Sequence, residues 1–188
     1  SMICDSNKNG YSYISKDNWN VHYTAADGTK ITCRGKNNRG EKPNALIQDK
    51  WESAVNGAID FSDSLSKVEN TNISLVTFSG SASIATEFSH TALTARDFGH
   101  PEGNTNLQAG LSNAIDKLKE ITDPNAQKYI VVIGDGQPTS GGSNGKSATD
   151  RAMDRAYEAK NDNKITVFSI GYGIENDATA KDVLKKIS

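Results

Sequence analysis

Residues 128–139 read KYIVVIGDGQPT, and this stretch decides the fold. The apolar, mostly β-branched residues 129–133 are typical of a strand buried on both faces, as in the middle of a parallel α/β sheet. The run stops at Gly134, so Asp135 lies where the strand ends and a loop begins. Open α/β sheets bind ligands beyond the carboxyl ends of their strands. Asp135 is therefore a candidate ligand of a hard cation, and the alternative is that it only stabilises a turn.

The pattern on both sides of this strand alternates between helical and strand periods from residue 44 onward. This order predicts an α/β fold with a doubly wound, mostly parallel sheet and helices on both faces. A sheet of this kind would have a central strand before the first helix and further structure after the last one. We therefore expect the first central strand and the C-terminal end of the domain to be missing. The expected helices cover 44–66, 107–118, 148–157 and 178–187, and the expected strands cover 72–79, 83–88, 128–133 and 164–170.

Residues 1–43 differ from the rest because they are polar and their apolar residues alternate. Short strands are expected at 11–14, 19–23 and 29–33, with a tight turn at Asp27-Gly28. We interpret 1–43 as a small β-hairpin insertion and 44–188 as an incomplete α/β domain. Cys4 and Cys33 are the only cysteines. They could form a disulfide in an oxidising compartment or remain free thiols in a reducing one.

Composition excludes several classes of function. The chain has 188 residues, 35% hydrophobic content and a net charge of −2. Without a basic stripe, we expect no nucleic-acid partner. No apolar run approaches the roughly 18 residues that span a bilayer, so we expect no membrane insertion of this domain. The chain also has no Gly-x-Ser-x-Gly motif that would mark the nucleophile of a hydrolase, and we expect it not to be an enzyme.

One segment matches part of a nucleotide-binding loop motif. Residues 140–147 end in the Gly-Lys-Ser of a phosphate-binding loop, with Lys146 as its lysine. The motif requires glycine where this chain has Ser140, and the loop begins several residues after its strand. A flexible surface loop is the preferred interpretation, and a nucleotide hydrolase using Lys146 is an alternative. Absence of an ATP-induced thermal shift would exclude that alternative.

A second loop is more informative. Residues 103–107 read GNTNL and open the helix at 107–118. In a doubly wound sheet this loop and Asp135 reach the same edge. The hydroxyl of Thr105 and the carboxylate of Asp135 would then form an oxygen site suited to magnesium or manganese. The alternative is that Thr105 or Asn106 is simply the helix N-cap.

Four segments together resemble a von Willebrand factor type A domain: 76–79 (VTFS), 103–107, 133–139 and 167–173 (VFSIGYG). The resemblance covers the chain from about residue 44 to its end. It implies a metal-ion-dependent adhesion site for Mg²⁺ (or Mn²⁺ or Ca²⁺), with Thr105 and Asp135 as metal ligands. The family's first metal loop, Asp-x-Ser-Gly-Ser, is absent here. Ser1-Met2 matches its end, which would make Ser1 a third ligand; the alternative is that Ser1-Met2 is a cloning remnant.

The position of the 1–43 insertion resembles the arms of type A domains in Gram-positive pilus-tip and surface adhesins. That resemblance implies a non-enzymatic, extracellular adhesin of the cell surface or cell wall. Its expected partners are a protein or host extracellular-matrix ligand with an acidic group, and other pilus or surface subunits. The alternative is an intracellular type A scaffold domain attached to metal chelatases or assembly machines. Free thiols at Cys4 and Cys33 would favour that alternative.

Overall fold

The computed structural model describes the backbone of residues 12–17, 20–24, 30–34, 49–98, 104–135, 137–174 and 177–188, with side chains from residue 54 onward within these ranges. The chain forms two compact units that divide between Val55 and Asn56. The domain boundary predicted between residues 43 and 44 lies outside the described residues.

The described part of the first unit is a three-stranded antiparallel sheet with the order β1-β2-β3. Its strands are β1 (Ser12–Asp17), β2 (Asn20–Thr24) and β3 (Lys30–Arg34). All five residues of β2 pair with β3, in a register that places Val21 opposite Cys33. Cys4, and with it the predicted disulfide, lies outside the described residues.

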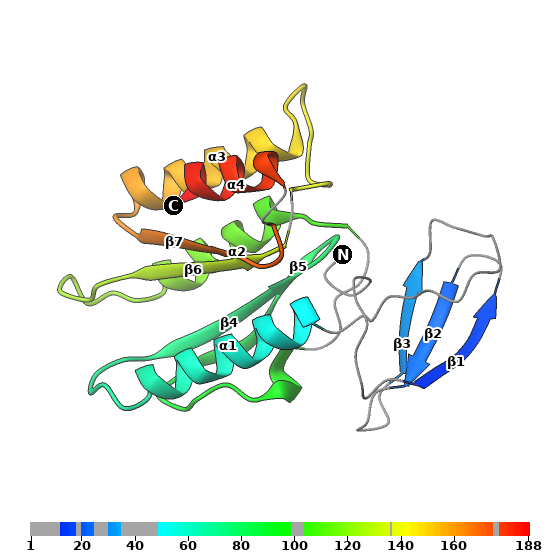
Figure 1. Cartoon of the computed structure of the whole chain (residues 1–188). Helices are drawn as coiled ribbons and strands as arrows, with labels where there is room; N and C mark the ends of the chain where they lie inside the picture. Colours follow the sequence, from blue (N-terminus) through cyan, green and yellow to red (C-terminus); the bar gives the residue numbers. More distant parts are fainter. Residues whose placement is uncertain are drawn as a thin grey trace. The chain divides into compact units, whose positions relative to one another are not determined.

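Helices and strands alternate through the second unit (Figure 1). The helix α1 is described from Asp49, so the start predicted for it at residue 44 lies outside the described residues. None of the described helices is long and apolar enough to cross a membrane. The elements that follow β3 are α1 (Asp49–Leu65), within which the two units divide, β4 (Ile73–Phe78), β5 (Ala82–Ser89), the 3-10 turn η1 (Ala95–Phe98), α2 (Leu107–Lys119), β6 (Tyr129–Gly134), α3 (Ala148–Tyr157), the π-helical turn η2 (Glu158–Asp162), β7 (Thr166–Gly171) and α4 (Ala178–Ile187).

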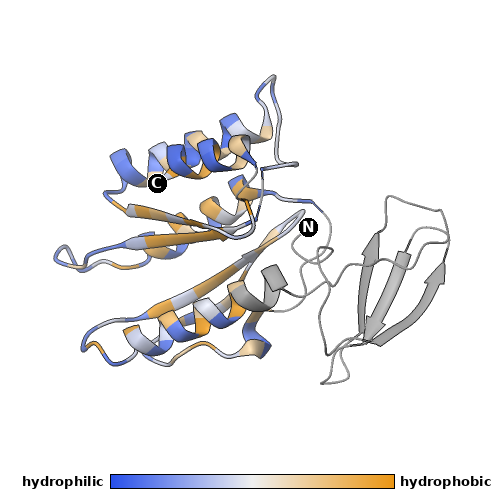
Figure 2. Ribbon diagram, in the orientation of Figure 1, coloured by the Kyte–Doolittle hydropathy of each residue, from blue (hydrophilic) through white to orange (hydrophobic). Residues whose placement is uncertain are grey.

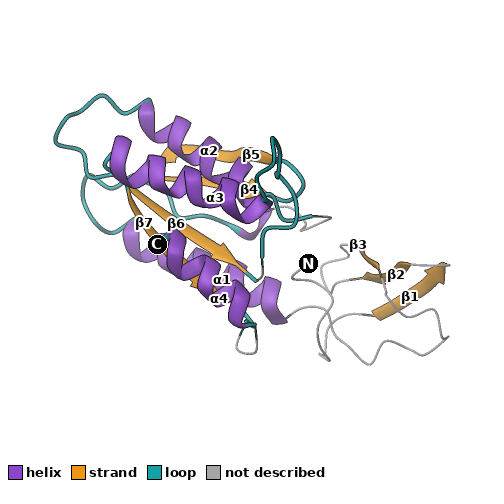
Figure 3. Ribbon diagram, turned by 90° about the horizontal axis from the view of Figure 1, so that it is seen from above, coloured by secondary structure: helices purple, strands orange, loops and turns teal. Residues whose placement is uncertain are grey.

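The strands of this unit pair in two separate ways, which Figure 3 shows from above. β4 and β5 form an antiparallel hairpin, which confirms the predicted hairpin partner. β6 and β7 run parallel, with Ile130 opposite Val167 and Gly134 opposite Gly171. Parallel strands need a crossover, and α3 with η2 supplies it. The α/β class is confirmed. The sequence predicts a single sheet for this unit, whereas its described strands form two two-stranded sheets, β4–β5 and β6–β7.

The core lies between the β6–β7 pair and the helices α2, α3 and α4. Leu111 and Ile115 of α2 are each only 1% exposed. Ala152 and Ala156 on α3 leave room for close packing against neighbouring elements, because alanine adds only a methyl group. Figure 2 shows the hydrophobic residues concentrated along the strands of this unit, while the helices are mixed.

The opposite face of the β6–β7 pair is only partly covered. Ile130 and Val132 are buried, but Tyr129 is 51% exposed. On β7, Phe168 is 51% and Ile170 43% exposed, and the rings of Tyr129 and Phe168 stack with their centroids 6.3 Å apart. The prediction that this strand is buried on both faces is therefore wrong for the described residues. Ile130 and Val132 of β6 lie in the core with α2, α3 and α4, whereas Val131 and Ile133 on the other face of the strand are only half-buried.

Candidate functional site

Asp135 lies directly after β6, as predicted. The end of this strand is tied to the loop after β7, because the Tyr172 amide donates to the Gly134 carbonyl at 2.9 Å. Asp135 is half-buried, and its carboxylate has no hydrogen-bond partner among the described residues. An acidic group in this position can accept a ligand without first breaking a bond to a described neighbour.

Thr105 is bound to the loop that follows Asp135. Its amide donates to Thr139 Oγ1 at 2.8 Å. Its carbonyl accepts from the Thr139 amide at 2.9 Å and from the Ser140 amide at 3.2 Å. These bonds use the backbone of Thr105 and leave its side-chain hydroxyl without a partner among the described residues. The loop before α2 and the loop after β6, which the sequence predicts at one edge, are thus held against each other.

Asn106 is the N-cap of α2, because its Oδ1 accepts from the Ala109 amide at 3.1 Å. The cap interpretation therefore applies to Asn106 and not to Thr105. The same residue also contacts the β4–β5 turn: its amide donates to the Ser79 carbonyl at 2.6 Å, and its Nδ2 donates to the Gly80 carbonyl at 3.1 Å. Three loops therefore meet around residues 105 and 106.

Three of the free polar groups of this region are oxygens. Besides the Thr105 hydroxyl and the Asp135 carboxylate, Ser140 Oγ is buried and has no hydrogen-bond partner. A buried hydroxyl without a partner calls for an explanation such as a water or an ion. No group of His, Cys, Asp and Glu residues that could hold a metal occurs among the described residues. Hydroxyl and carboxylate oxygens without imidazole or thiolate fit a hard cation that keeps several waters. Ser1, the third predicted ligand, lies outside the described residues.

The Lys146 loop has its charges already paired. Lys146 Nζ lies 2.6 Å from Asp154 Oδ2. The N-terminus of α3 is closed by a capping box in which Ser147 Oγ accepts from the Asp150 amide, and Asp150 Oδ2 accepts from the Ser147 amide. The side-chain and backbone hydrogen bonds from Ser147 lower the pKa of the Asp150 carboxyl. A carboxylate thus stands where a phosphate-binding loop would place its phosphate, which favours the surface-loop interpretation.

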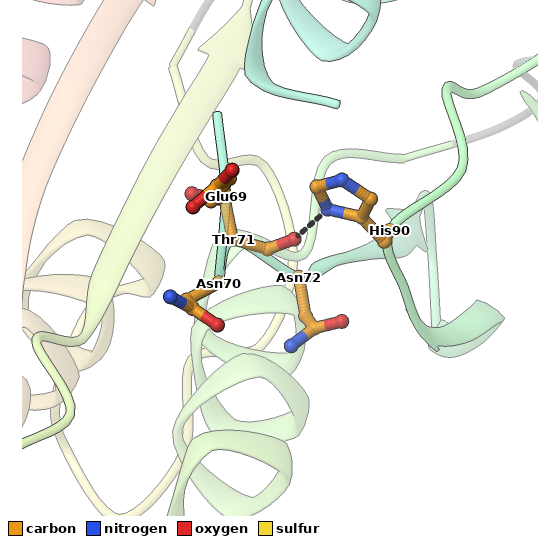
Figure 4. Close-up of a pocket in the computed structure, with 5 residues that line it drawn as sticks. All are labelled: Glu69, Asn70, Thr71, Asn72 and His90. Carbon is orange, nitrogen blue, oxygen red and sulfur yellow. Dashed lines mark hydrogen bonds between the residues drawn. The ribbon is translucent and has the colours of Figure 1, made fainter. Parts of the chain in front are cut away.

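An open hollow of about 400 Å³ lies at the other end of the β4–β5 hairpin (Figure 4). It is lined by the turn before β4 and by His90, whose Nδ1 is 2.6 Å from the Thr71 carbonyl. Because the turn at 79–81 joins the opposite ends of β4 and β5, this hollow takes no part in the arrangement around Thr105. Its lining residues are Glu69, Asn70, Thr71, Asn72 and His90.

The residues that hold the loops together carry no periodic signal in the sequence. Thr139, Ser79 and Gly80 bind through backbone groups or a short hydroxyl, and neither helical nor strand periodicity marks such contacts. The signal that was available is the turn chemistry of residues 79–81, since Ser and Gly are common in tight turns.

Comparisons with solved structures and with family models agree with this architecture. A search of curated proteins found no match. Among solved structures, the chain is similar to the manganese-loaded TRAP protein of Plasmodium vivax, with 22% identity and a TM-score of 0.50. The similarity covers 71% of this chain and 52% of that one, so the chain spans about half the length of its neighbour. The family model for the von Willebrand factor type A domain matches residues 45–188, and the chain therefore belongs to this family.

Proposed function

We propose that this chain is a non-enzymatic, adhesion-type ligand-binding domain that works through a divalent cation, Mg²⁺ (or Mn²⁺ or Ca²⁺), held at Thr105 and Asp135. The observation that carries the proposal is the set of hydrogen bonds between Thr105 and the pair Thr139 and Ser140. These bonds hold Thr105, whose hydroxyl is free, against the loop that follows Asp135, whose carboxylate is free, at one edge of the domain.

Each residue would have a distinct part in holding the ion. Asp135 supplies negative charge, and Thr105 supplies a neutral oxygen directly or through water. A hard cation takes about six oxygens, so water and further ligands complete the shell. Ser1 is the proposed third protein ligand. When bound, the ion would supply a positive centre with an open coordination position for an acidic group of a protein ligand.

The setting of the domain is part of the proposal. We place it outside the cell, at the cell surface or cell wall, and a Gram-positive pilus-tip adhesin with neighbouring pilus subunits is the narrower form of this hypothesis. Its ligand would be a protein, such as a host extracellular-matrix component, that presents a carboxylate. An intracellular scaffold domain of a chelatase or assembly complex is the second candidate, and a titration of thiols at Cys4 and Cys33 separates the two.

Manganese is a suitable probe because the ion is paramagnetic and because the structural neighbour is manganese-loaded. We expect Mn²⁺ to broaden the amide NMR signals of Thr105, Thr139 and Ser140 before those of other residues. Asp135→Asn should raise the Mn²⁺ concentration needed for this broadening at least about tenfold, because the variant removes the charge that attracts the ion.

Asp162→Asn is the matched control. Asp162 is an exposed carboxylate at the end of η2, before β7, and has no partner among the described residues. This variant makes the same change of net charge and should bind Mn²⁺ like the parent. Equal broadening in the Asp135→Asn variant and in the parent would refute the proposed site.

A further inference from the structure

One side chain links the three loops around Thr105. The Oδ1 of Asn106 caps α2, and its Nδ2 donates to the Gly80 carbonyl in the β4–β5 turn. On its third side Asn106 lies against Gly141: a Cβ at residue 141 would be 3.0 Å from Asn106 Cγ and closer still to Oδ1. Only a residue without a side chain fits there.

A cap alone does not account for this arrangement. An N-cap needs one acceptor oxygen, and Asp or Ser provides it as well as Asn does. The amide nitrogen of Asn106 makes a separate bond to Gly80, a residue that takes no part in α2. Since the backbone amide of Asn106 also donates to Ser79, the β4–β5 turn is attached to this residue at two points.

The neighbouring residue is Thr105, which is held from its other side by Thr139 and Ser140. We propose that Asn106 is the positioning residue of the cation site: it fixes the β4–β5 turn and the loop at Gly141 around Thr105, so that the Thr105 hydroxyl stays in place for the ion. This inference rests on the proposed function. It assigns to the β4–β5 turn an indirect part in cation binding, although the turn supplies no ligand.

Two variants separate the cap from the link to the turn. Asn106→Asp keeps the capping oxygen but puts an oxygen in place of the donor that faces the Gly80 carbonyl. Asn106→Ser also keeps a capping oxygen, on a side chain too short to reach Gly80. The added charge of the aspartate would, by itself, attract Mn²⁺ more strongly. The positioning role predicts the opposite: Mn²⁺ broadening at Thr139 and Ser140 should need about three- to tenfold more Mn²⁺ in both variants.

A second measurement needs no metal. The Thr105 amide is bonded to Thr139 Oγ1, so its hydrogen exchange reports whether this loop stays in place. We expect about tenfold faster exchange of the Thr105 amide in both variants, while the amides of the core strand β6 exchange as in the parent. A purely structural cap would change neither the Thr105 exchange nor the Mn²⁺ response, because both variants keep it.

The outcomes separate this inference from the proposed function. Parent-like Mn²⁺ binding in both Asn106 variants, alongside a loss of binding in Asp135→Asn, would overturn the positioning role and leave the metal site intact. Unchanged binding in Asp135→Asn would refute the metal site itself. Loss of the folded spectrum in both Asn106 variants would also overturn the inference, because Asn106 would then be required for the fold.

Discussion

Substitution of Gly141 by alanine tests the geometry around Asn106 through stability alone. Gly141 has a φ of 97°, a conformation that L-residues adopt at a cost of roughly 1–2 kcal/mol. The new methyl group would also collide with the carboxamide of Asn106, the N-cap of α2. Displacing a cap costs about 1 kcal/mol. We therefore expect Gly141→Ala to lower the free energy of unfolding by about 2–3 kcal/mol.

Gly145→Ala provides the control within the same loop. Gly145 also has a positive φ, 74°, but nothing lies within 4 Å of the position its Cβ would take. This variant should lose only the roughly 1–2 kcal/mol of backbone strain. Because 1 kcal/mol corresponds to about 2–4 °C for a chain of this size, thermal melts should separate the two variants by roughly that amount.

A double-mutant cycle with Asn106→Ala shows whether the additional cost passes through Asn106. In the Asn106→Ala background the collision is gone, so the cost of Gly141→Ala should fall to that of Gly145→Ala. If Gly141→Ala and Gly145→Ala are equally destabilising, or if the cost of Gly141→Ala is the same in both backgrounds, the contact between Gly141 and Asn106 does not matter and the reasoning is refuted.

Two further predictions concern other polar contacts. Ser62 is 1% exposed, and its Oγ accepts from the backbone amide of Leu93 at 2.9 Å. Ser62→Ala should therefore lower the free energy of unfolding by about 1–3 kcal/mol in denaturant titrations. The control is Ser64→Ala at an exposed position of the same helix, which should change the free energy of unfolding by less than about 0.5 kcal/mol. Parent-like stability of Ser62→Ala would contradict this. The hydrogen bonds from Ser147 lower the pKa of Asp150, so the ionised carboxylate stabilises the fold fully above the ordinary pKa of 3.8, and this stabilisation is lost as the pH falls below that value. The difference in stability between the parent and Asp150→Asn should therefore shrink on acidification. A difference that does not depend on pH would contradict the assignment.

The order of elements from residue 44 onward could be predicted because local patterns are sufficient for it. The apolar run at β6 and the helical spacing of Leu107, Leu111 and Ile115 each specify an element without reference to any other. The extent of burial could not be predicted in the same way. An apolar strand has the same sequence whether one or both of its faces are covered, and exposed Phe168 and Ile170 show that coverage depends on what packs against the strand.

The two site residues in the described part of the chain could be proposed from their positions at strand and helix ends. Asp135 follows a strand and Thr105 precedes a helix, and the topology of an α/β sheet brings such loops to one edge. Their assignment as metal ligands came from this convergence of two oxygen-bearing side chains together with the family resemblance, and it stays a prediction. The contacts that hold them could not be predicted. The bond from Thr105 to Thr139 joins residues far apart in sequence through one hydroxyl, and no periodic pattern encodes such a pair.

The stability of the domain and the geometry of the proposed site depend on different residues. Leu111, Ile115 and Val132 lie in a core whose apolar burial contributes about 25 cal/mol per Å². The bonds around Thr105 are partly exposed, and each contributes only about 1 kcal/mol net. Losing one of them leaves the core intact but releases a loop that carries a proposed ligand. Substitutions that remove one of these bonds at residues 106 and 139 should therefore affect cation binding at a smaller loss of stability than substitutions in the core, where large-to-small changes cost about 2–5 kcal/mol.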